Sequence, residues 1–264
     1  MKFSVLLSLY NKESPQFLMD CLVSIRDNSI SPDQIIIVYD GPINEELDSI
    51  VVSFTDTLPI EIIRIEVNVG LGNALNYGLN YIRNNVVFRM DTDDKCHLQR
   101  FEKQLSFMKE NPDIAILGSA ISEYDETMSH YSGTRFTAEN HIDIINYAKA
   151  RNPFNHMTVV FKKDSIISVG GYQHHYAMED YNLWLRLIAA GYKTHNLPES
   201  LVYVRAGEGL LNRRKGWEYV LSEFKIARLK YAIGIDTLPS VIRYSSMRLL
   251  PRLLPVTMLK YIYK

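Results

Sequence analysis

The sequence predicts an α/β fold in which a mostly parallel sheet is covered by helices on both faces. The first observation is an apolar run at residues 3–9, then apolar residues at helical spacing, then a second apolar run at Ile35–Tyr39. A strand, a helix and a strand within about 40 residues form a βαβ unit, which joins parallel strands. The second observation is that these strands are continuously apolar, as expected when both faces are buried. The third is an apolar strand, Val86–Met90, that runs directly into three acids.

Each element in the first half follows from its own pattern of apolar and turn residues. Tyr10–Pro15 breaks the first strand, and the helix after it has an apolar face made of Phe17, Leu18, Cys21, Leu22 and Ile25. Asp40-Gly41-Pro42 ends the second strand, and a third strand follows at Ile60–Ile65. The loop Asn68–Ala74 then opens a helix whose apolar face is Leu75, Gly78, Leu79 and Ile82.

Beyond the acids the pattern is more mixed. A helix is predicted at about residues 97–108 and a strand at Ile114–Leu117, whereas residues 119–136 are typical of irregular or edge-strand structure. The remaining chain is predicted to contain a short helix at 142–150, a strand at Met157–Phe161, a helix from Glu179, a strand at Leu201–Val204 and a helix at about 218–231.

Composition limits the class of protein. With 264 residues, 47% of them hydrophobic, the chain can bury the core of one α/β domain with a tail. A net charge of −1 argues against general nucleic-acid binding, which needs a basic face. Cys21 and Cys96 lack a paired spacing, so we expect a reducing compartment and no disulfide. No apolar run approaches the length of a membrane span.

Asp91, Asp93 and Asp94 crowd three carboxylates into four residues at the end of a buried strand. Such crowding is unfavourable unless a cation lies among the carboxylates, and the break from strand to turn lets Asp91 and Asp93 converge on one ion. Hard oxygen ligands favour Mg²⁺ or Mn²⁺, which in enzymes commonly hold phosphates. The alternative is that these acids form a solvated turn that caps the next helix.

Two further motifs each have two interpretations. Gly70 and Gly72 fit part of a dinucleotide-binding loop, but Leu75 stands at the third glycine position and the loop follows the third strand. The glycines instead favour a loop that passes close to a sugar nucleotide or to neighbouring residues. Glu179 and Asp180 at a helix start are, taken alone, typical of capping.

Together these motifs make the chain resemble glycosyltransferase family two. The resemblance covers about residues 3–217 and rests on five stretches in order: Leu9-Tyr10-Asn11-Lys12-Glu13, Asp40-Gly41, Asn68-x-Gly70-Leu71-x-x-Ala74-Leu75-Asn76, Asp91-Thr92-Asp93-Asp94 and Glu179-Asp180-Tyr181-x-Leu183-Trp184. Bacterial polysaccharide transferases of the amylovoran and O-antigen type are the most similar members. The resemblance implies a Rossmann-like GT-A fold and inversion of the anomeric centre.

The resemblance also implies a role for each motif at the donor. The nucleotide base and ribose of a UDP-sugar would be held by Leu9, Tyr10, Asn11, Glu13 and Asp40, with Gly70 and Asn73 in the adjoining loop. An acid such as Asp40 can accept the uracil imide N–H. Asp91 would bind the ribose or the donor sugar, Asp93 would ligate Mn²⁺ or Mg²⁺, and Asp94 would be an alternative or supporting ligand.

On the acceptor side, the resemblance places the general base in the pair that opens a helix. We expect Asp180 to be that base, with Glu179 orienting it or contacting the acceptor. His156 is either another polar group near the acceptor or a packed loop histidine. Arg213 and Arg214, together with Lys215 and Trp217, stand where related enzymes carry a mobile loop over the diphosphate; the alternative is a solvated basic helix start.

The resemblance divides the chain into a catalytic domain at 1–217, with nucleotide-sugar (1–118) and acceptor (119–217) halves, and a C-terminal helical segment at 218–264. After Asp236 there is no acid, and the charges are those of Arg243, Arg248, Arg252, Lys260 and Lys264. A basic amphipathic tail suits an anionic membrane, here the inner face of the bacterial plasma membrane reached from the cytoplasm. A packing tail or an oligomer contact is the alternative.

The resulting hypothesis is transfer of a hexose, with galactose in β linkage as the candidate, from a UDP-sugar to a sugar on polyprenyl diphosphate in O-antigen or exopolysaccharide synthesis. A sugar nucleotidyltransferase would share the layout and the metal acids, but its first loop is rich in glycine and Leu9–Pro15 has none. A non-catalytic sugar-nucleotide-binding subunit of a polysaccharide assembly complex is the third alternative; the presence of both acid groups argues against it.

Overall fold

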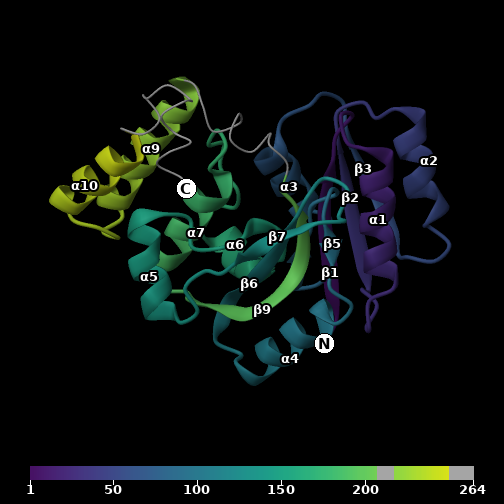
Figure 1. Cartoon of the computed structure of the whole chain (residues 1–264), viewed down its shortest axis with the longest axis horizontal. Helices are drawn as coiled ribbons and strands as arrows, with labels where there is room; N and C mark the ends of the chain where they lie inside the picture. Colours follow the sequence, from purple (N-terminus) through teal and green to yellow (C-terminus); the bar gives the residue numbers. More distant parts are fainter. Residues whose placement is uncertain (207–216, 250–264) are drawn as a thin grey trace.

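A curved nine-stranded sheet runs through the part of the chain that the structure, a computed structural model, describes, namely residues 1–206 and 217–249 (Figure 1). Its strands are β1 (Phe3–Leu9), β2 (Gln34–Asp40), β3 (Ile60–Ile65), β4 (Val86–Arg89), β5 (Lys95–Cys96), β6 (Ile114–Tyr124), β7 (Tyr131–Arg135), β8 (Val160–Lys162) and β9 (Lys193–Arg205). They lie in the order β3-β2-β1-β4-β8-β6-β9-β5, and β7 pairs with β6. The block β3-β2-β1-β4 is parallel throughout, as the βαβ pattern predicted.

Helices cover both faces of this sheet. They are α1 (Pro15–Arg26), α2 (Glu45–Ser53), α3 (Leu71–Leu79), α4 (Arg100–Glu110), α5 (His141–Ala150), α6 (Lys163–Ser168), α7 (Glu179–Ala189), α9 (Trp217–Ala232) and α10 (Leu238–Leu249), with a 3-10 turn η1 at His156–Thr158. Because side chains alternate along a strand, Leu7 and Leu9 pack with α1, α2 and α4, whereas Leu6 packs with α3, α5, α7 and α9. The predicted α/β fold with helices on both faces is confirmed.

The order of the strands brings two loops together. β1 lies between β2 and β4, so the chain reverses its direction of travel across the sheet at the β1/β4 boundary. Leu6 of β1 pairs with Arg89 of β4, and the backbone N–H of Met90 donates to the Leu6 carbonyl at 3.2 Å. In open parallel sheets, ligands bind beyond the carboxyl ends of the strands at such a reversal. The loop after β1 and the acids after β4 both begin there.

The second half contains longer strands than the sequence indicated. β6 continues to Tyr124, and β9 begins at Lys193, eight residues before the predicted start at Leu201. These two strands pair in parallel from Ile114 to Tyr124, with register shifts around Ser119. The polar segment 193–200 therefore becomes a strand through hydrogen bonds to β6, which no local pattern displays. The short elements α2, α6 and β5 were also not predicted.

The C-terminal helices pack against the domain. Tyr219 and Ile226 of α9 join the apolar cluster that includes α7. Lys230 Nζ donates to the Lys149 carbonyl at 2.8 Å, and Arg248 Nη1 of α10 donates to the Ala150 carbonyl at 3.0 Å. Two cations thus satisfy carbonyls at the end of α5, where the helix dipole favours positive charge. Figure 1 shows α9 and α10 at the opposite end of the molecule from α1 and α2.

The predicted C-terminal segment, residues 218–264, is described as far as residue 249. Its basic tail from 250 to 264 lies outside the described residues. Among the described helices, none combines the length and the apolar character that a membrane crossing requires.

Candidate active site

Three carboxylates gather where β4 ends. Oxygens of Asp91, Asp93 and Asp94 all lie within 4.8 Å of one another. Burial, and then the charge of Asp91, raises the pKa of Asp93 to about 6; burial and then Asp93 raise the pKa of Asp94 well above its ordinary value. Because crowded hard oxygen donors are relieved by positive charge, this donor set fits a divalent cation. These acids do not cap the next helix, since α4 begins only at Arg100.

Arg89, the last residue of β4, places a positive charge next to these acids. Its side chain is 1% exposed, and its guanidinium forms an ion pair with the Asp91 carboxylate. Its Nε and Nη1 atoms have no hydrogen-bond partner among the described residues. Sequence analysis did not identify this residue, although a basic residue inside an otherwise apolar strand was a visible signal.

Arg205, at the end of β9, fixes the acid turn from the other half of the molecule. Its Nη1 donates to the backbone carbonyl of Asp93, and its backbone N–H donates to Asp94 Oδ1 at 3.2 Å. Its Nη2 donates to Asp20 Oδ2 at 2.5 Å, and the guanidinium lies 4.1 Å from the centre of the Phe17 ring. β9 and α1 therefore hold the turn in place. The sequence placed Arg205 after a strand but gave no indication of these partners.

Glu179 and Asp180 open α7 on the opposite side of the site. Asp180 Oδ2 accepts a 2.6 Å hydrogen bond from Asn152 Nδ2, and its Oδ1 accepts a 2.7 Å bond from the backbone N–H of Tyr181. Burial raises the pKa of Asp180, and burial followed by the charge of Asp180 raises the pKa of Glu179 to about 7. Asp180 is therefore a desolvated carboxylate held by a neutral amide, which suits a proton acceptor. Asn152 was not recognised as its partner in the sequence.

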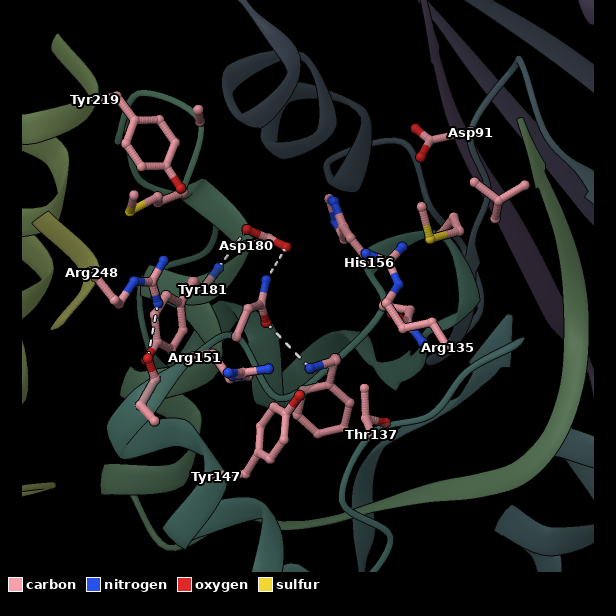
Figure 2. Close-up of a pocket in the computed structure, with 18 of the residues that line it drawn as sticks. Asp91, Arg135, Thr137, Tyr147, Arg151, His156, Asp180, Tyr181, Tyr219 and Arg248 are labelled. Carbon is pink, nitrogen blue, oxygen red and sulfur yellow. Dashed lines mark hydrogen bonds between the residues drawn. The ribbon is translucent and has the colours of Figure 1, made fainter. Parts of the chain in front are cut away.

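A cavity of about 760 Å³ joins these two groups. It is lined by Asp91, Asp93 and Asp94 and also by Asp180, residues separated by almost 90 positions in the chain. Figure 2 shows Asp91 and Asp180 on different sides of this cavity, with His156 drawn between them. The remaining wall is contributed by β7, the end of α5 and the loop that follows it, the residues just before α7, the end of β9, and α9 and α10. Glu179 is not among the lining residues.

Residues that follow β1, predicted to bind the nucleotide, lie beside the acid turn. Glu13 Oε2 accepts a 2.5 Å hydrogen bond from Thr92 Oγ1, so the two loops are directly connected. Asn11 Oδ1 accepts from the backbone N–H that precedes α2 at 2.8 Å. Tyr10 is 43% exposed, whereas Leu9 is fully buried in the core.

Asp40 holds the glycine loop in place. Its side chain is 4% exposed, and its two oxygens accept the backbone N–H groups of Val69 at 2.7 Å and Gly70 at 3.0 Å. Gly70 has φ +86°, which favours glycine. Asn73 is exposed, and its side-chain amide donates to the Val69 carbonyl at 2.9 Å. Each Asp40 oxygen retains a lone pair with which a ligand can bond.

In a dinucleotide-binding motif the second glycine approaches the pyrophosphate, whereas Gly72 approaches the side chain of Glu179. A Cβ atom at Gly72 would lie 3.0 Å from Glu179 Cβ and 3.1 Å from Glu179 Cγ. The missing side chain therefore lets α3 approach the start of α7. This is the predicted alternative in which the loop passes close to neighbouring residues.

His156 is both packed and turned toward the cavity. Its Nε2 lies 2.9 Å from the Tyr172 hydroxyl in a hydrogen bond, and it is one of the lining residues. Burial, followed by the charge of Arg89, lowers its pKa well below the ordinary value, so the imidazole is neutral.

The predicted basic loop is only partly described. Arg213, Arg214 and Lys215 lie outside the described residues. Trp217 begins α9 and is 70% exposed.

Comparison with known proteins gives a consistent set of similarities. The model of the family described as "Glycosyl transferase family 2" matches residues 4–174. The amylovoran biosynthesis glycosyltransferase AmsE of Erwinia amylovora is 45% identical over 99% of this chain and 98% of the relative. A UDP-Gal:alpha-D-GlcNAc-diphosphoundecaprenol beta-1,3-galactosyltransferase of Escherichia coli is 40% identical over 100% of this chain and 95% of the relative.

Solved structures show the same fold. Staphylococcus aureus TarS 1–349 in complex with UDP-GlcNAc superposes with a TM-score of 0.69 at 17% identity, covering 88% of this chain and 67% of that one. In a longer TarS structure the match spans 40% of the chain. The mannosyltransferase PcManGT of Pyrobaculum calidifontis, in complex with GDP-Man and Mn²⁺, gives a TM-score of 0.62 at 13% identity over 94% of this chain and 80% of that one.

Proposed function

The chain belongs to glycosyl transferase family 2, and from that premise we propose that it is a metal-dependent, inverting hexosyltransferase. The donor is a UDP-sugar and the acceptor is a sugar on a polyprenyl diphosphate carrier, in O-antigen or exopolysaccharide synthesis. Galactose transferred in β linkage is the proposed hexose, because the relative that is 40% identical over the whole chain is named for that reaction.

The observation that supports this proposal most is the shared cavity. It places a group suited to hold a diphosphate, Asp91 with Asp93 and Asp94, across from a group suited to accept a proton, Asp180. Inversion by one direct displacement needs the base and the leaving group on opposite faces of the donor sugar. A cavity with one group on each side meets that requirement.

The chain's own residues would carry the displacement as follows. Asp180 accepts the proton of the acceptor hydroxyl, while Asn152 holds the carboxylate in position. The hydroxyl oxygen forms its new bond to the anomeric carbon from the face opposite UDP. The bond between that carbon and the UDP oxygen breaks, and its electron pair leaves with UDP. The loop of Tyr10, Asn11 and Glu13 with Asp40 would hold the nucleotide.

The metal proposed for this site is Mn²⁺ or Mg²⁺. Asp93 and Asp91 would hold it, with Asp94, which is 2% exposed, as the alternative or supporting ligand. A bound divalent cation neutralises charge that develops on a departing diphosphate. Arg89 and Arg205 keep the three carboxylates in place through their contacts with Asp91 and with the backbone of Asp93.

The proposed location is the cytoplasmic face of the plasma membrane, as a peripheral protein. One side of α9, which we call the α9 face, presents Trp217, Leu221, Phe224 and Tyr231, which are between 43% and 70% exposed. Their spacing places them on one stripe of the helix, and the basic residues Lys225 and Arg228 are exposed beside them. An exposed aromatic and basic face favours an anionic bilayer surface.

The decisive experiment is an assay of UDP release and product formation. The purified protein is incubated with a panel of UDP-sugars and a synthetic N-acetylhexosamine-diphosphate-lipid acceptor, with Mn²⁺ or with EDTA. We expect product with one UDP-hexose only in the presence of the metal, and a β configuration of the new linkage by NMR. UDP-sugar binding without any turnover would favour the non-catalytic subunit, and metal-independent turnover would remove the metal from the proposal.

A further inference from the structure

The wall of the cavity carries groups of both charges. The carboxylates of Asp91, Asp93 and Asp94 line it, and so do the guanidinium groups of Arg135, Arg151 and Arg248, which come from β7, the residue after α5, and α10. The three acids have a ligand in the proposed function. These three arginines have none.

Two of these arginines already have carboxylate partners. Arg135 lies 3.3 Å from Glu123. Arg248 lies 2.7 Å from Glu223, whose side chain is 3% exposed, and also donates to the Ala150 carbonyl. Both guanidinium groups are thereby fixed as parts of the wall, and their charges are compensated.

Arg151 is different. No carboxylate of the described residues lies within 4.0 Å of its guanidinium, which is 5.7 Å from the centre of the Tyr147 ring. Thr137, another lining residue, has a buried Oγ1 atom with no hydrogen-bond partner among the described residues. In Figure 2, the Arg151 side chain extends into the area between Tyr147 and Asp180. The wall of the cavity thus offers an exposed guanidinium without a carboxylate partner and a buried hydroxyl group without a hydrogen-bond partner among the described residues.

The position of Arg151 in the chain relates it to the proposed base. It directly precedes Asn152, whose amide donates to Asp180 at 2.6 Å. Arg151 and Asp180 line the same cavity. In the proposed function, the acceptor sugar whose hydroxyl meets Asp180 lies in this cavity, and its diphosphate is attached at its own anomeric carbon.

We propose that Arg151 is the binding residue for the diphosphate of the acceptor, with Thr137 as a neutral donor to it. The proposal rests on the proposed function and adds a second phosphate-recognition subsite, distinct from the one that holds UDP. A guanidinium binds phosphate oxygens through a planar fork of N–H donors. The enzyme would then require the charged link in its acceptor and not only the sugar.

The test compares two synthetic acceptors that carry the same sugar and the same alkyl chain, one linked through a diphosphate and one through a neutral ether. For wild type, Arg151→Ala and Arg151→Lys, the ratio of kcat/KM for the diphosphate acceptor to that for the ether is measured. We expect Arg151→Ala to lower this ratio by about tenfold or more, and Arg151→Lys to restore part of it. Arg83→Ala, an exposed arginine outside the cavity, is the matched control and leaves the ratio unchanged.

Binding of the diphosphate acceptor in the presence of UDP, measured by calorimetry, gives a readout that does not depend on turnover. Arg151→Ala should weaken it by about tenfold, with the affinity for UDP unchanged. An equal loss with both acceptors, or an increase confined to the KM of the UDP-sugar, would overturn the proposal. Absence of turnover in the wild type with every donor would instead contradict the proposed function, and the binding comparison would still decide the role of Arg151.

Discussion

At the scale of single residues, the site is governed by carboxylates that are partly or fully shielded from water. Asp93, Asp94, Glu179 and Asp180 all have raised pKa values, and burial is the largest cause for each. Arg89 is a buried cation, and its charge lowers the pKa of all four carboxyl groups, which opposes the effect of burial. Such an arrangement is suited to binding cations and moving protons rather than to stability.

Asp93→Asn tests the metal assignment. Loss of one charged oxygen donor should weaken Mn²⁺-dependent UDP binding by about tenfold to a hundredfold, and transfer should fall at least as much. Calorimetric titration of UDP with and without Mn²⁺ measures the effect. Asp113→Asn, at an exposed ion pair outside the cavity, is the control. Equal metal dependence in wild type and Asp93→Asn would exclude Asp93 as a ligand.

Asp180→Asn tests the base. The amide keeps the shape and the contact with the backbone N–H of Tyr181 but cannot accept a proton, so we expect kcat to fall by about 10²–10⁴ while the donor still binds. Asn152→Ala should give a smaller loss, about tenfold, because the carboxylate remains but is no longer held. Steady-state kinetics with a saturating UDP-sugar separates these effects. A variant Asp180→Asn with full turnover would place the base elsewhere.

Glu179→Gln tests, through the free energy of unfolding, whether Glu179 is shielded from water beside Asp180. Because the pKa of Glu179 rises from 4.5 to about 7 on folding, the folded state binds its proton more tightly, and the free energy of unfolding falls as pH rises between these values. Glutamine has no such penalty. The variant should therefore gain stability relative to wild type at pH 8, by up to roughly 3 kcal/mol, but not at pH 4.5.

Urea unfolding of both proteins at several pH values measures this difference. Glu126→Gln, at an exposed position, is the control and should show no change with pH relative to wild type. A stability difference between Glu179→Gln and wild type that stays constant from pH 4.5 to pH 8 would contradict the assignment.

At the scale of elements, α3 carries two glycines that allow close approach to different neighbours, Gly72 to the start of α7 and Gly78 to the sheet. A Cβ at Gly72 would meet Glu179, whereas a Cβ at Gly78 would lie 2.7 Å from side-chain atoms of Leu6 and Val38 in the sheet. One contact is with the pair Glu179 and Asp180, and the other is with the core. The two substitutions to alanine therefore separate positioning from packing.

Gly72→Ala and Gly78→Ala should both lower the free energy of unfolding, by about 1–3 kcal/mol, because each adds a methyl group to a filled space. Only Gly72→Ala should also lower kcat, by roughly tenfold, since the displaced side chain is Glu179 at the start of α7, next to the proposed base Asp180. Denaturation and steady-state kinetics on both variants make the comparison. Equal kcat values for the two would show that α7 tolerates displacement.

An element could be predicted when its own residues show its conformation, and not when its conformation depends on a distant partner. β1, β2 and β4 were identified because a buried parallel strand is a continuous apolar run, and β3, at the edge of the sheet, because four of its six residues are isoleucine. The first eight residues of β9 were not, because their conformation is fixed by hydrogen bonds to β6 and their sequence is polar. Arg205 follows the part of that strand that was predicted, Leu201–Val204, but its contacts with Asp93, Asp94 and Asp20 depend on the tertiary structure.

At the scale of the whole molecule, α9 and α10 lie beside the cavity and also carry exposed apolar residues. Tyr219, Tyr244 and Met247 line the cavity, and the α9 face is on the surface. A protein docked through this face would hold the cavity near the bilayer, where a polyprenyl-linked sugar resides. The acceptor could then enter without leaving the membrane.

The double variant Leu221→Glu with Phe224→Glu should lose sedimentation with vesicles that contain anionic lipid, because two charges replace apolar contact area. Val52→Glu with Ile167→Glu changes two comparably exposed residues on α2 and α6 and serves as the control. Undiminished sedimentation of the first variant would exclude the α9 face. Truncation after Asp236 should also release the protein, but it removes α10 and with it part of the cavity wall.

The sequence by itself determined the family, the α/β fold and the identity of the two acid groups, because these depend on local patterns: apolar runs, helical spacing and acids next to a strand or at a helix start. Only the tertiary structure decided that Asp91 and Asp180 face one cavity, that Asn152 holds Asp180, and that Arg151 lines the wall without a carboxylate partner. Those relations join residues from separate strands and helices. They follow from how the sheet curves and how the elements pack, which no short stretch of sequence records.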